Sequence, residues 1–356
     1  MKNRLQQLAD SLPAEIDAAL VTSPISRRYL LGFPSSAGMI VVTKDGSHFI
    51  IDSRYFEAAQ KKIDFCEVVL QDELYKQIAA ILEKFAVNAV AVERENVTLS
   101  EFAQMQTKLP GFRLIAENPL SELIEKQRMI KSADEIADIR AAQEIADKTF
   151  EHILGFIKPG VTELEIAVEM EQFSRKSGSD GPSFEFIVAA GSNSSIPHAA
   201  PGGCAVKRGD FVTMDFGCIV NGYHSDMTRT VAVGKISEKQ RRVYDLVLAA
   251  QLAPLPAIKP GAVCRDIDKI ARDMIDSTEF KGLFGHGLGH SLGLLIHENP
   301  RFNHGCETVL VPGMVMSVEP GIYIPGEFGV RIEDCVVVAE SGNINICRSS
   351  KELITL

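Results

Sequence analysis

The sequence predicts an α+β protein with two domains: a small α/β domain, then a larger domain built from a duplicated helix–sheet unit. Its 356 residues exceed what a single hydrophobic core usually serves. Short apolar runs alternate with amphipathic stretches over residues 1 to about 120, which is typical of a small α/β domain. Beyond that point, two kinds of segment each occur twice. We therefore expect domains at 1–121 and 122–356.

In the first domain, apolar runs such as "AALVTS", "GMIVV" and "NAVAVE" predict strands. Amphipathic patterns predict helices around residues 55–62, 73–86 and 99–108. After the boundary, Ser132 and Glu135 have the spacing of a capping box and predict the start of a long helix.

The second domain contains two pairs of internally repeated segments. "IKPGVTELEIAVEMEQF" begins at Ile157 and "IKPGAVCRDIDKIARDMI" at Ile258, each with a Pro-Gly helix stop before an amphipathic helix. "GDFVTMDFG" and "GMVMSVEPG" place Asp215 and Glu319 at matching positions. The offsets of 101 and 104 residues predict a duplicated unit with pseudo-twofold symmetry and a site between its halves.

Composition excludes several classes of protein. A net charge of −10 and a pI near 5.4 argue against nucleic acid or an anionic membrane as the main partner. The seven cysteines form no C-x-x-C pair, which favours a reducing cytoplasmic location over a disulfide scaffold or a thiolate zinc site. Neither a signal peptide nor a run of about 18 apolar residues occurs. A short peptide or other small molecule is the expected partner.

Asp215 and Glu319 fall in or beside strands that are apolar enough to be buried, where an unpaired carboxylate is costly. Asn221-Gly222 predicts a tight hairpin turn. If that turn has two residues, Asp215 faces Thr228, and Asp226 lies diagonally beside Asp215 on the same face.

The same construction recurs downstream. A loop centred on Gly326 would bring Glu319 opposite Glu333. Four converging carboxylates would repel one another, and two divalent cations would neutralise their charge. The alternative for each acid is an ordinary salt bridge, for which the candidate partners are Arg229, Arg331 and Lys207.

The stretch "FGHGLGHSLGLLIHE" contains His286, His290 and His297. His290 is the natural nitrogen donor to the predicted ions, and the flanking histidines are further ligands or catalytic groups. Carboxylates with one imidazole suit Mn²⁺, Fe²⁺ or Co²⁺ better than a thiolate zinc site. The H-x-x-x-H spacing does not indicate a zinc-protease helix, because no glutamate follows His286 and two glycines disfavour a helix.

These segments together resemble a known metallopeptidase family, the Xaa-Pro aminopeptidases, prolidases and methionine aminopeptidases. The resemblance lies in "MDFGCIVNGYHSDMTRTVAVG", "GHGLGHSLGLLIHENPRF" and "MSVEPGIYIPGEFGVRIEDCVVV". It implies a pita-bread fold for the second domain. The first domain resembles, more loosely, a creatinase-type N-terminal domain through "RRYLLGFPSSAGMIVV".

The resemblance implies a dinuclear metal site whose ligands correspond to Asp215, Asp226, His290, Glu319 and Glu333. Two divalent ions are expected, with Mn²⁺ favoured and Co²⁺, Fe²⁺ or Zn²⁺ as alternatives. A hydroxide bridging the ions would be the nucleophile.

The resemblance also implies roles for other residues. Glu319 would act as general base, and His198 and His297 would donate hydrogen bonds to the substrate carbonyl and the tetrahedral intermediate. His286 has a less certain role, which includes simple support of its loop. Arg301 matches an arginine that in prolidases holds the C-terminal carboxylate of a dipeptide, although short aminopeptidases of the family share it.

The predicted function is therefore an Xaa-Pro-type aminopeptidase acting on short peptides, with Xaa-Pro dipeptidase (prolidase) activity as the alternative. A remote alternative is a non-catalytic peptide-binding module of the same fold, which the complete ligand set disfavours. A homodimer is expected from the resemblance, because the first domain packs against a second subunit in relatives.

Overall fold

The computed structural model describes residues 2–356 as two compact units, which join in the sequence between Arg128 and Met129. The predicted boundary near residue 121 lies at the beginning of helix α6 (Leu120–Met129). None of the helices in these described residues is long and apolar enough to cross a membrane.

The first unit is built on a six-stranded sheet in the order β4-β3-β2-β1-β5-β6. Its strands are β1 (Ala18–Val21), β2 (Met39–Thr43), β3 (Ser47–Ile51), β4 (Glu67–Leu70), β5 (Ala89–Val92) and β6 (Arg113–Ile115). Its helices before α6 are α1 (Lys2–Ser11), α2 (Pro24–Leu31), α3 (Ser53–Lys62), α4 (Leu74–Lys84) and α5 (Leu99–Lys108). Strands β1 and β5 are buried throughout, which explains their continuous apolar runs. The predicted helices and strands of this unit are confirmed.

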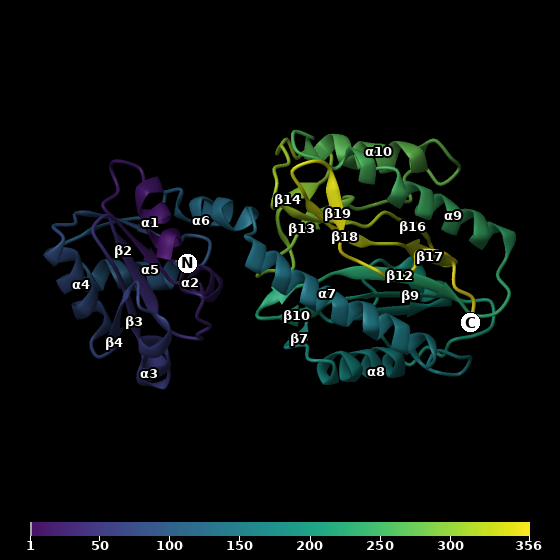
Figure 1. Ribbon diagram of the computed structural model, residues 1–356, viewed down its shortest axis with the longest axis horizontal. Coiled ribbons are helices and arrows are strands. Elements are labelled where there is room, and N and C mark those ends of the chain that lie inside the picture. Colours follow the sequence, from purple (N-terminus) through teal and green to yellow (C-terminus); the bar gives the residue numbers. More distant parts are fainter. Residues whose placement is uncertain (1) are drawn as a thin grey trace. The chain divides into compact units, whose positions relative to one another are not determined.

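The helices of the second unit enclose its strands. They are α7 (Ala133–Leu154), α8 (Glu163–Lys176), α9 (Glu238–Leu252) and α10 (Cys264–Asp276), with 3₁₀ turns η1 (Gly191–Ser195) and η2 (Leu255–Ala257). Ser132 caps α7 through the predicted capping box with Glu135. Figure 1 shows α7 and α8 on one side of the strands, with α9 and α10 on the other. Two hydrophobic clusters match this division, one for each helix pair.

The strands of the second unit form short antiparallel sheets, in the orders β11-β10-β7, β12-β9-β8, β14-β13-β15-β18-β19 and β16-β17. In the first half the strands are β7 (Gly181–Pro182), β8 (Ile187–Ala190), β9 (Phe211–Phe216), β10 (Cys218–Val220), β11 (Tyr223–His224) and β12 (Met227–Ala232). In the second half they are β13 (Gly289–Ser291), β14 (Glu298–Phe302), β15 (Val315–Val318), β16 (Gly321–Ile324), β17 (Phe328–Arg331), β18 (Asp334–Val338) and β19 (Asn343–Asn345).

The two halves repeat the same backbone connections. Helix α8 begins where the Glu163 amide donates to the carbonyl of Cys204, and α10 begins where the Cys264 amide donates to the carbonyl of Thr308, both at 3.0 Å. Each "IKPG" segment therefore leads into a helix whose first residue donates its amide to an equivalent backbone carbonyl. The predicted duplication is confirmed.

A close backbone approach fixes the bend between β9 and β10. A Cβ atom built on Gly217 would lie 1.8 Å from the carbonyl oxygen of Ser225, far inside van der Waals contact. The backbone here leads directly to Asp226, so the bend positions a residue of the predicted site.

We therefore expect Gly217→Ala to destabilise the protein by about 1 to 3 kcal/mol or more, because the neighbouring backbone must move. Gly203→Ala is the matched control, since a Cβ atom there meets nothing within 4 Å. Chemical denaturation of both variants measures the difference in the free energy of unfolding. Equal stabilities would contradict this account of the bend.

Candidate metal centre

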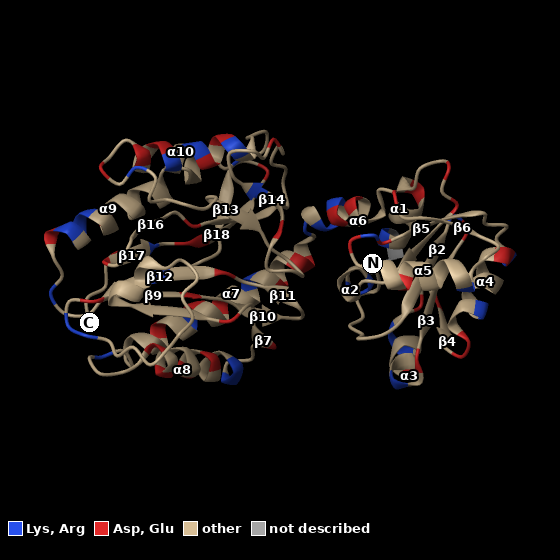
Figure 2. Cartoon of the chain, turned by 180° about the vertical axis from the view of Figure 1, so that it is seen from behind, with Lys and Arg blue, Asp and Glu red and all other residues tan. Residues whose placement is uncertain are grey.

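A cavity of about 500 Å³ in the second unit contains the predicted site. Every site residue predicted from the sequence lines it: Asp215, Asp226, His290, Glu319, Glu333, His198, His297 and Arg301. Charged residues of both signs also cover the outer helices α8 and α10 (Figure 2). The acids of the cavity differ from those surface charges, because Asp215, Asp226 and Glu333 are buried and Glu319 is only partly exposed.

The first hairpin positions Asp215 and Asp226 as its turn predicts. Asn221 and Gly222 both have positive φ, and Thr228 pairs directly with Asp215. Strands β10 and β11 continue the register of β9 and β12. Asp226, which directly precedes β12, consequently lies two residues from Thr228, the partner of Asp215, and on the same face.

The second hairpin positions the glutamates in the same way. Val318 pairs with Asp334 in one ladder, and Gly321 pairs with Arg331 in the next. Both pairs belong to one continuous register, which places Glu319 opposite Glu333 in the gap between the ladders. The expected geometry of both hairpins is confirmed.

His290 presents a lone pair to this cluster. Burial, with a smaller effect of His297, lowers the pKa of His290 to about 3, so its imidazole is neutral. Its Nδ1 lies 3.1 Å from the carbonyl oxygen of Ser291, to which it donates. Nε2 is therefore an acceptor, yet it lies 3.3 Å from Glu319 Oε1 and 3.5 Å from Asp226 Oδ2. With both acids ionised, these facing acceptors repel one another unless a metal ion or a proton on one carboxylate lies between them.

Three carboxylate oxygens of the cluster support the same conclusion. Asp215 Oδ1, Asp226 Oδ1 and Glu333 Oε1 are buried without a hydrogen-bond partner. Ligand atoms of Asp226, His290 and Glu333 lie within 4.8 Å of one another. Buried acceptors without donors are costly. A hard, oxygen-preferring divalent ion fits this donor set.

The carboxylates raise one another's pKa values. Burial, followed by the charge of Asp215, raises the pKa of Glu319 to about 8. Burial and the neighbouring charges of Asp215 and Glu319 raise the pKa of Asp226, and burial and Asp226 raise that of Glu333. Without a cation, the cluster therefore favours protonated acids.

One arginine links both hairpins, and the sequence indicated it only as a possible salt-bridge partner. Arg331 donates from Nη2 to Asp215 Oδ2 at 2.6 Å and from Nε to Thr228 Oγ1 at 3.1 Å. Thr228 in turn donates to Glu333 Oε2 at 2.7 Å. The salt-bridge alternative thus holds for Asp215, and it leaves the other oxygen of that carboxylate free to face the cavity.

His286 and Tyr323 extend this network. The Tyr323 hydroxyl lies 2.9 Å from His286 Nε2 and accepts from Arg331 Nη1 at 2.8 Å. Burial lowers the pKa of His286 to about 4, so it is neutral. No sequence motif marked Tyr323, because its contact with Arg331 depends on the β16–β17 register.

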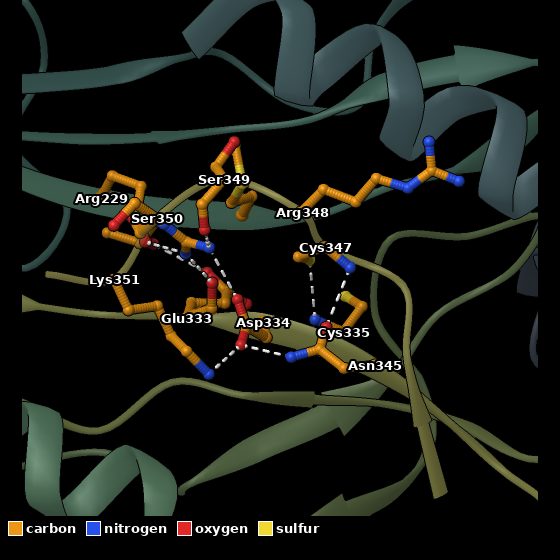
Figure 3. Close-up of polar contacts among 12 residues, drawn as sticks. Arg229, Glu333, Asp334, Cys335, Asn345, Cys347, Arg348, Ser349, Ser350 and Lys351 are labelled. Atoms are coloured by element: carbon orange, nitrogen blue, oxygen red, sulfur yellow. Dashed lines mark hydrogen bonds and ion pairs between the residues drawn. The ribbon is translucent and has the colours of Figure 1, made fainter. Parts of the chain in front are cut away.

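A second buried network lies behind Glu333 (Figure 3). Arg229, which is 1% exposed, donates to the carbonyl of Glu333 and, at 2.7 Å, to the Asp334 carboxylate. Burial opposes ionisation of Asp334, but the charges of Arg229 and Lys351 outweigh it and lower its pKa. Arg229 therefore fixes the backbone at Glu333, and its side chain donates to backbone carbonyls and to the Asp334 carboxylate.

The remaining predicted residues lie on the cavity wall. The rings of His290 and His297 are 4.5 Å apart, and burial lowers the pKa of His297. Arg301 on β14 pairs directly with His290 on β13, so their side chains share one face of the sheet. His198 lies in the loop between η1 and β9 and also lines the cavity.

Comparisons with known proteins agree with this site. The model of metallopeptidase family M24 matches residues 137–340, and the creatinase/prolidase N-terminal domain matches residues 3–130. The chain belongs to metallopeptidase family M24. Its second unit has the pita-bread fold, and its first unit is the creatinase-type domain expected from the sequence.

Several M24 relatives cover the whole chain. An Xaa-Pro dipeptidase of Pyrococcus furiosus is 35% identical over 358 residues, covering 99% of this chain and 100% of its own. The structure of an Xaa-Pro dipeptidase from Bacillus anthracis matches with a TM-score of 0.96 at 40% identity, covering 99% of both chains. An X-Pro aminopeptidase from Thermotoga maritima matches with a TM-score of 0.92 at 32% identity, covering 99% of this chain and 100% of its own.

The raised pKa values predict how pH affects the stability of the metal-free protein. Glu319 keeps its proton up to about pH 8 when folded, but loses it near its ordinary value when unfolded. The folded state therefore binds more protons at neutral pH, and its stability falls as pH rises toward 8. Buried His286 and His290 act in the opposite direction, but mostly below their ordinary pKa of about 6.5.

We expect the melting temperature of chelator-treated protein to fall between pH 7 and pH 8, and Mn²⁺ to reverse the fall. Glu319→Gln should make the metal-free profile less steep, because it removes one of the carboxylates whose pKa is raised in the folded state. Differential scanning calorimetry of both proteins measures the effect. A metal-free wild type whose stability rises over this pH range would contradict the proposed repulsion.

Proposed function

We propose that this chain is a metal-dependent exopeptidase that removes the N-terminal residue of short peptides with proline in second position. One observation carries the proposal: ligand atoms of Asp226, Glu333 and the neutral His290 lie within 4.8 Å of one another, and both acids have a buried oxygen without a donor. Such a set suits a divalent cation, and the M24 relatives of this chain include peptidases named for Xaa-Pro substrates.

The proposed ligands are those expected from the sequence: Asp215, Asp226, His290, Glu319 and Glu333. We propose two divalent ions, with Mn²⁺ favoured by the oxygen-rich donor set. When bound, they would supply Lewis-acid polarisation and an activated water as nucleophile.

The chain's own groups would then move protons and bind the developing charge. Glu319, whose carboxylate lies beside His290 Nε2, would accept the proton of the nucleophile and return it to the leaving nitrogen. His198 and His297 would donate hydrogen bonds to the carbonyl oxygen as it gains charge, an effect worth ~2.7 to 4 kcal/mol for each donor.

Arg301 supports a preference for dipeptides. Its strand pairing with His290 places the guanidinium on the same sheet face as a proposed ligand, in the same cavity. A guanidinium fork binds a carboxylate with two parallel hydrogen bonds. We propose that Arg301 binds the C-terminal carboxylate of an Xaa-Pro dipeptide. This reverses the preference inferred from the sequence, and aminopeptidase activity on longer peptides becomes the second candidate.

The relatives named above support both candidates, because they include Xaa-Pro dipeptidases and an X-Pro aminopeptidase. The expected homodimer and the expected cytoplasmic location stay predictions from the sequence.

We expect Asp226→Ala to abolish both Mn²⁺ binding and hydrolysis of Ala-Pro, since it removes a carboxylate from the centre of the ligand set. Asp64→Ala, on the exposed surface of the first unit, is the control and should leave both unchanged. Metal analysis and a peptidase assay give the two measurements. Normal hydrolysis by Asp226→Ala would overturn the metal-dependent mechanism.

The proposed length preference is tested with Ala-Pro, Ala-Pro-Ala and Met-Ala-Ala in the presence of Mn²⁺. We expect Ala-Pro to be cleaved best and Met-Ala-Ala not at all. Arg301→Ala should raise the KM for Ala-Pro roughly thirtyfold, as expected for the loss of a charge-assisted contact of about 2 kcal/mol.

Ala-Pro-amide, which lacks the carboxylate, is the control substrate. Arg301→Ala should change its KM little. Equal loss on both substrates would contradict the carboxylate contact, and better cleavage of Ala-Pro-Ala than of Ala-Pro would favour the aminopeptidase.

A further inference from the structure

Glu163 is a buried carboxylate that neither the sequence motifs nor the proposed mechanism uses. It is the first residue of α8 and is 1% exposed. Its Oε1 accepts from the Ala190 amide at 2.7 Å and from Asn193 Nδ2 at 3.0 Å, and its Oε2 accepts from the Gly202 amide at 3.2 Å. Three hydrogen bonds satisfy this buried carboxylate and bind it to the segments that carry the donors.

These donors lie at the two ends of one loop. Ala190 ends β8, and the chain from 191 to 202 then runs along the cavity before it returns to Gly202. His198 lies within this loop and lines the cavity. One oxygen of Glu163 holds the beginning of the loop and the other holds its end.

The rest of the loop contacts the hairpin that carries Arg331. The Gly329 amide donates to Ser194 Oγ at 2.9 Å, and Arg331 Nη1 donates to the Pro197 carbonyl at 3.4 Å. The loop is therefore held on one side by the β16–β17 hairpin and on the other by Glu163. Loss of the Glu163 contacts would leave its two ends without their shared anchor.

The second half of the duplicated unit shows that the fold does not require a carboxylate at the first position of this helix. The Leu164 amide donates to the Gly202 carbonyl, and the Arg265 amide donates to the Cys306 carbonyl in the matching position. Cys264 thus takes the place of Glu163, and helix α10 forms without the acid.

We propose that Glu163 is a positioning residue that fixes His198 in the cavity by joining the two ends of its loop. This inference rests on the role of His198 in the proposed function. Glu163→Gln keeps the size of the side chain, but one acceptor becomes an NH₂ donor that faces a backbone N–H. One end of the loop then loses its bond to the residue 163 side chain, and the shared anchor is broken.

A double-mutant cycle with Mn²⁺-loaded protein tests the proposal, using kcat/KM for Ala-Pro in Glu163→Gln, His198→Ala and the double variant. We expect a loss of roughly tenfold or more in each single variant, because misplacement of a catalytic group is costly. The double variant should be no slower than His198→Ala. Glu163→Gln should lower kcat and keep its affinity for Mn²⁺, measured by calorimetry, within about twofold of wild type.

Glu165→Gln is the matched control. It removes the same charge from the same helical turn, where Glu165 is exposed and accepts hydrogen bonds from the amide and the hydroxyl of Thr162. We expect it to retain the kcat/KM of wild type. If Glu163→Gln does not fold, Asn193→Ala removes one donor to the same carboxylate and takes its place in the cycle.

The outcomes separate the inference from the proposed function. Fully additive losses, weakened Mn²⁺ binding, or wild-type kcat in Glu163→Gln beside an impaired His198→Ala would overturn the positioning role alone. Wild-type activity in His198→Ala would overturn the proposed role of that histidine and the inference with it. Absence of Ala-Pro hydrolysis by the wild-type protein would overturn the proposed function itself.

Discussion

The mutual repulsion of buried carboxylates is the constraint on which the second unit depends. Asp226, Glu319 and Glu333 all have raised pKa values, because burial and neighbouring charges disfavour their ionised forms. A neutral His290 adds another acceptor instead of a balancing charge. The fold holds these groups together, although they would separate in a free chain. Cations that bind only the folded state would stabilise it.

Two hairpins make this assembly rigid. Each keeps one strand register across an interruption, so that its acidic residues face the same cavity. Arg331 and Thr228 then tie the hairpins together from within the site. Arg229 fixes the backbone on the opposite side of Glu333. Hydrogen bonds to one carboxylate oxygen leave the other oriented toward the cavity, which is how outer contacts orient metal ligands.

The duplication supplies a scaffold whose halves have diverged in their loops. Equivalent backbone bonds begin α8 and α10, so the common framework is set by main-chain contacts. The side chains at equivalent positions differ, with Glu163 in one half and Cys264 in the other. A fold of this kind can keep its helix–sheet geometry while its loops acquire separate tasks.

The domain types and the duplication were predictable from sequence patterning and from the family resemblance. The convergence of Asp215 with Asp226, and of Glu319 with Glu333, was predictable because hairpin register follows from local turn chemistry and from the two-residue period of strands. Only the tertiary structure showed that Arg331, Tyr323 and Glu163 support the site, since contacts between residues distant in sequence leave no periodic signal. The acids were therefore visible as a pattern, while the groups that hold them became visible only in space.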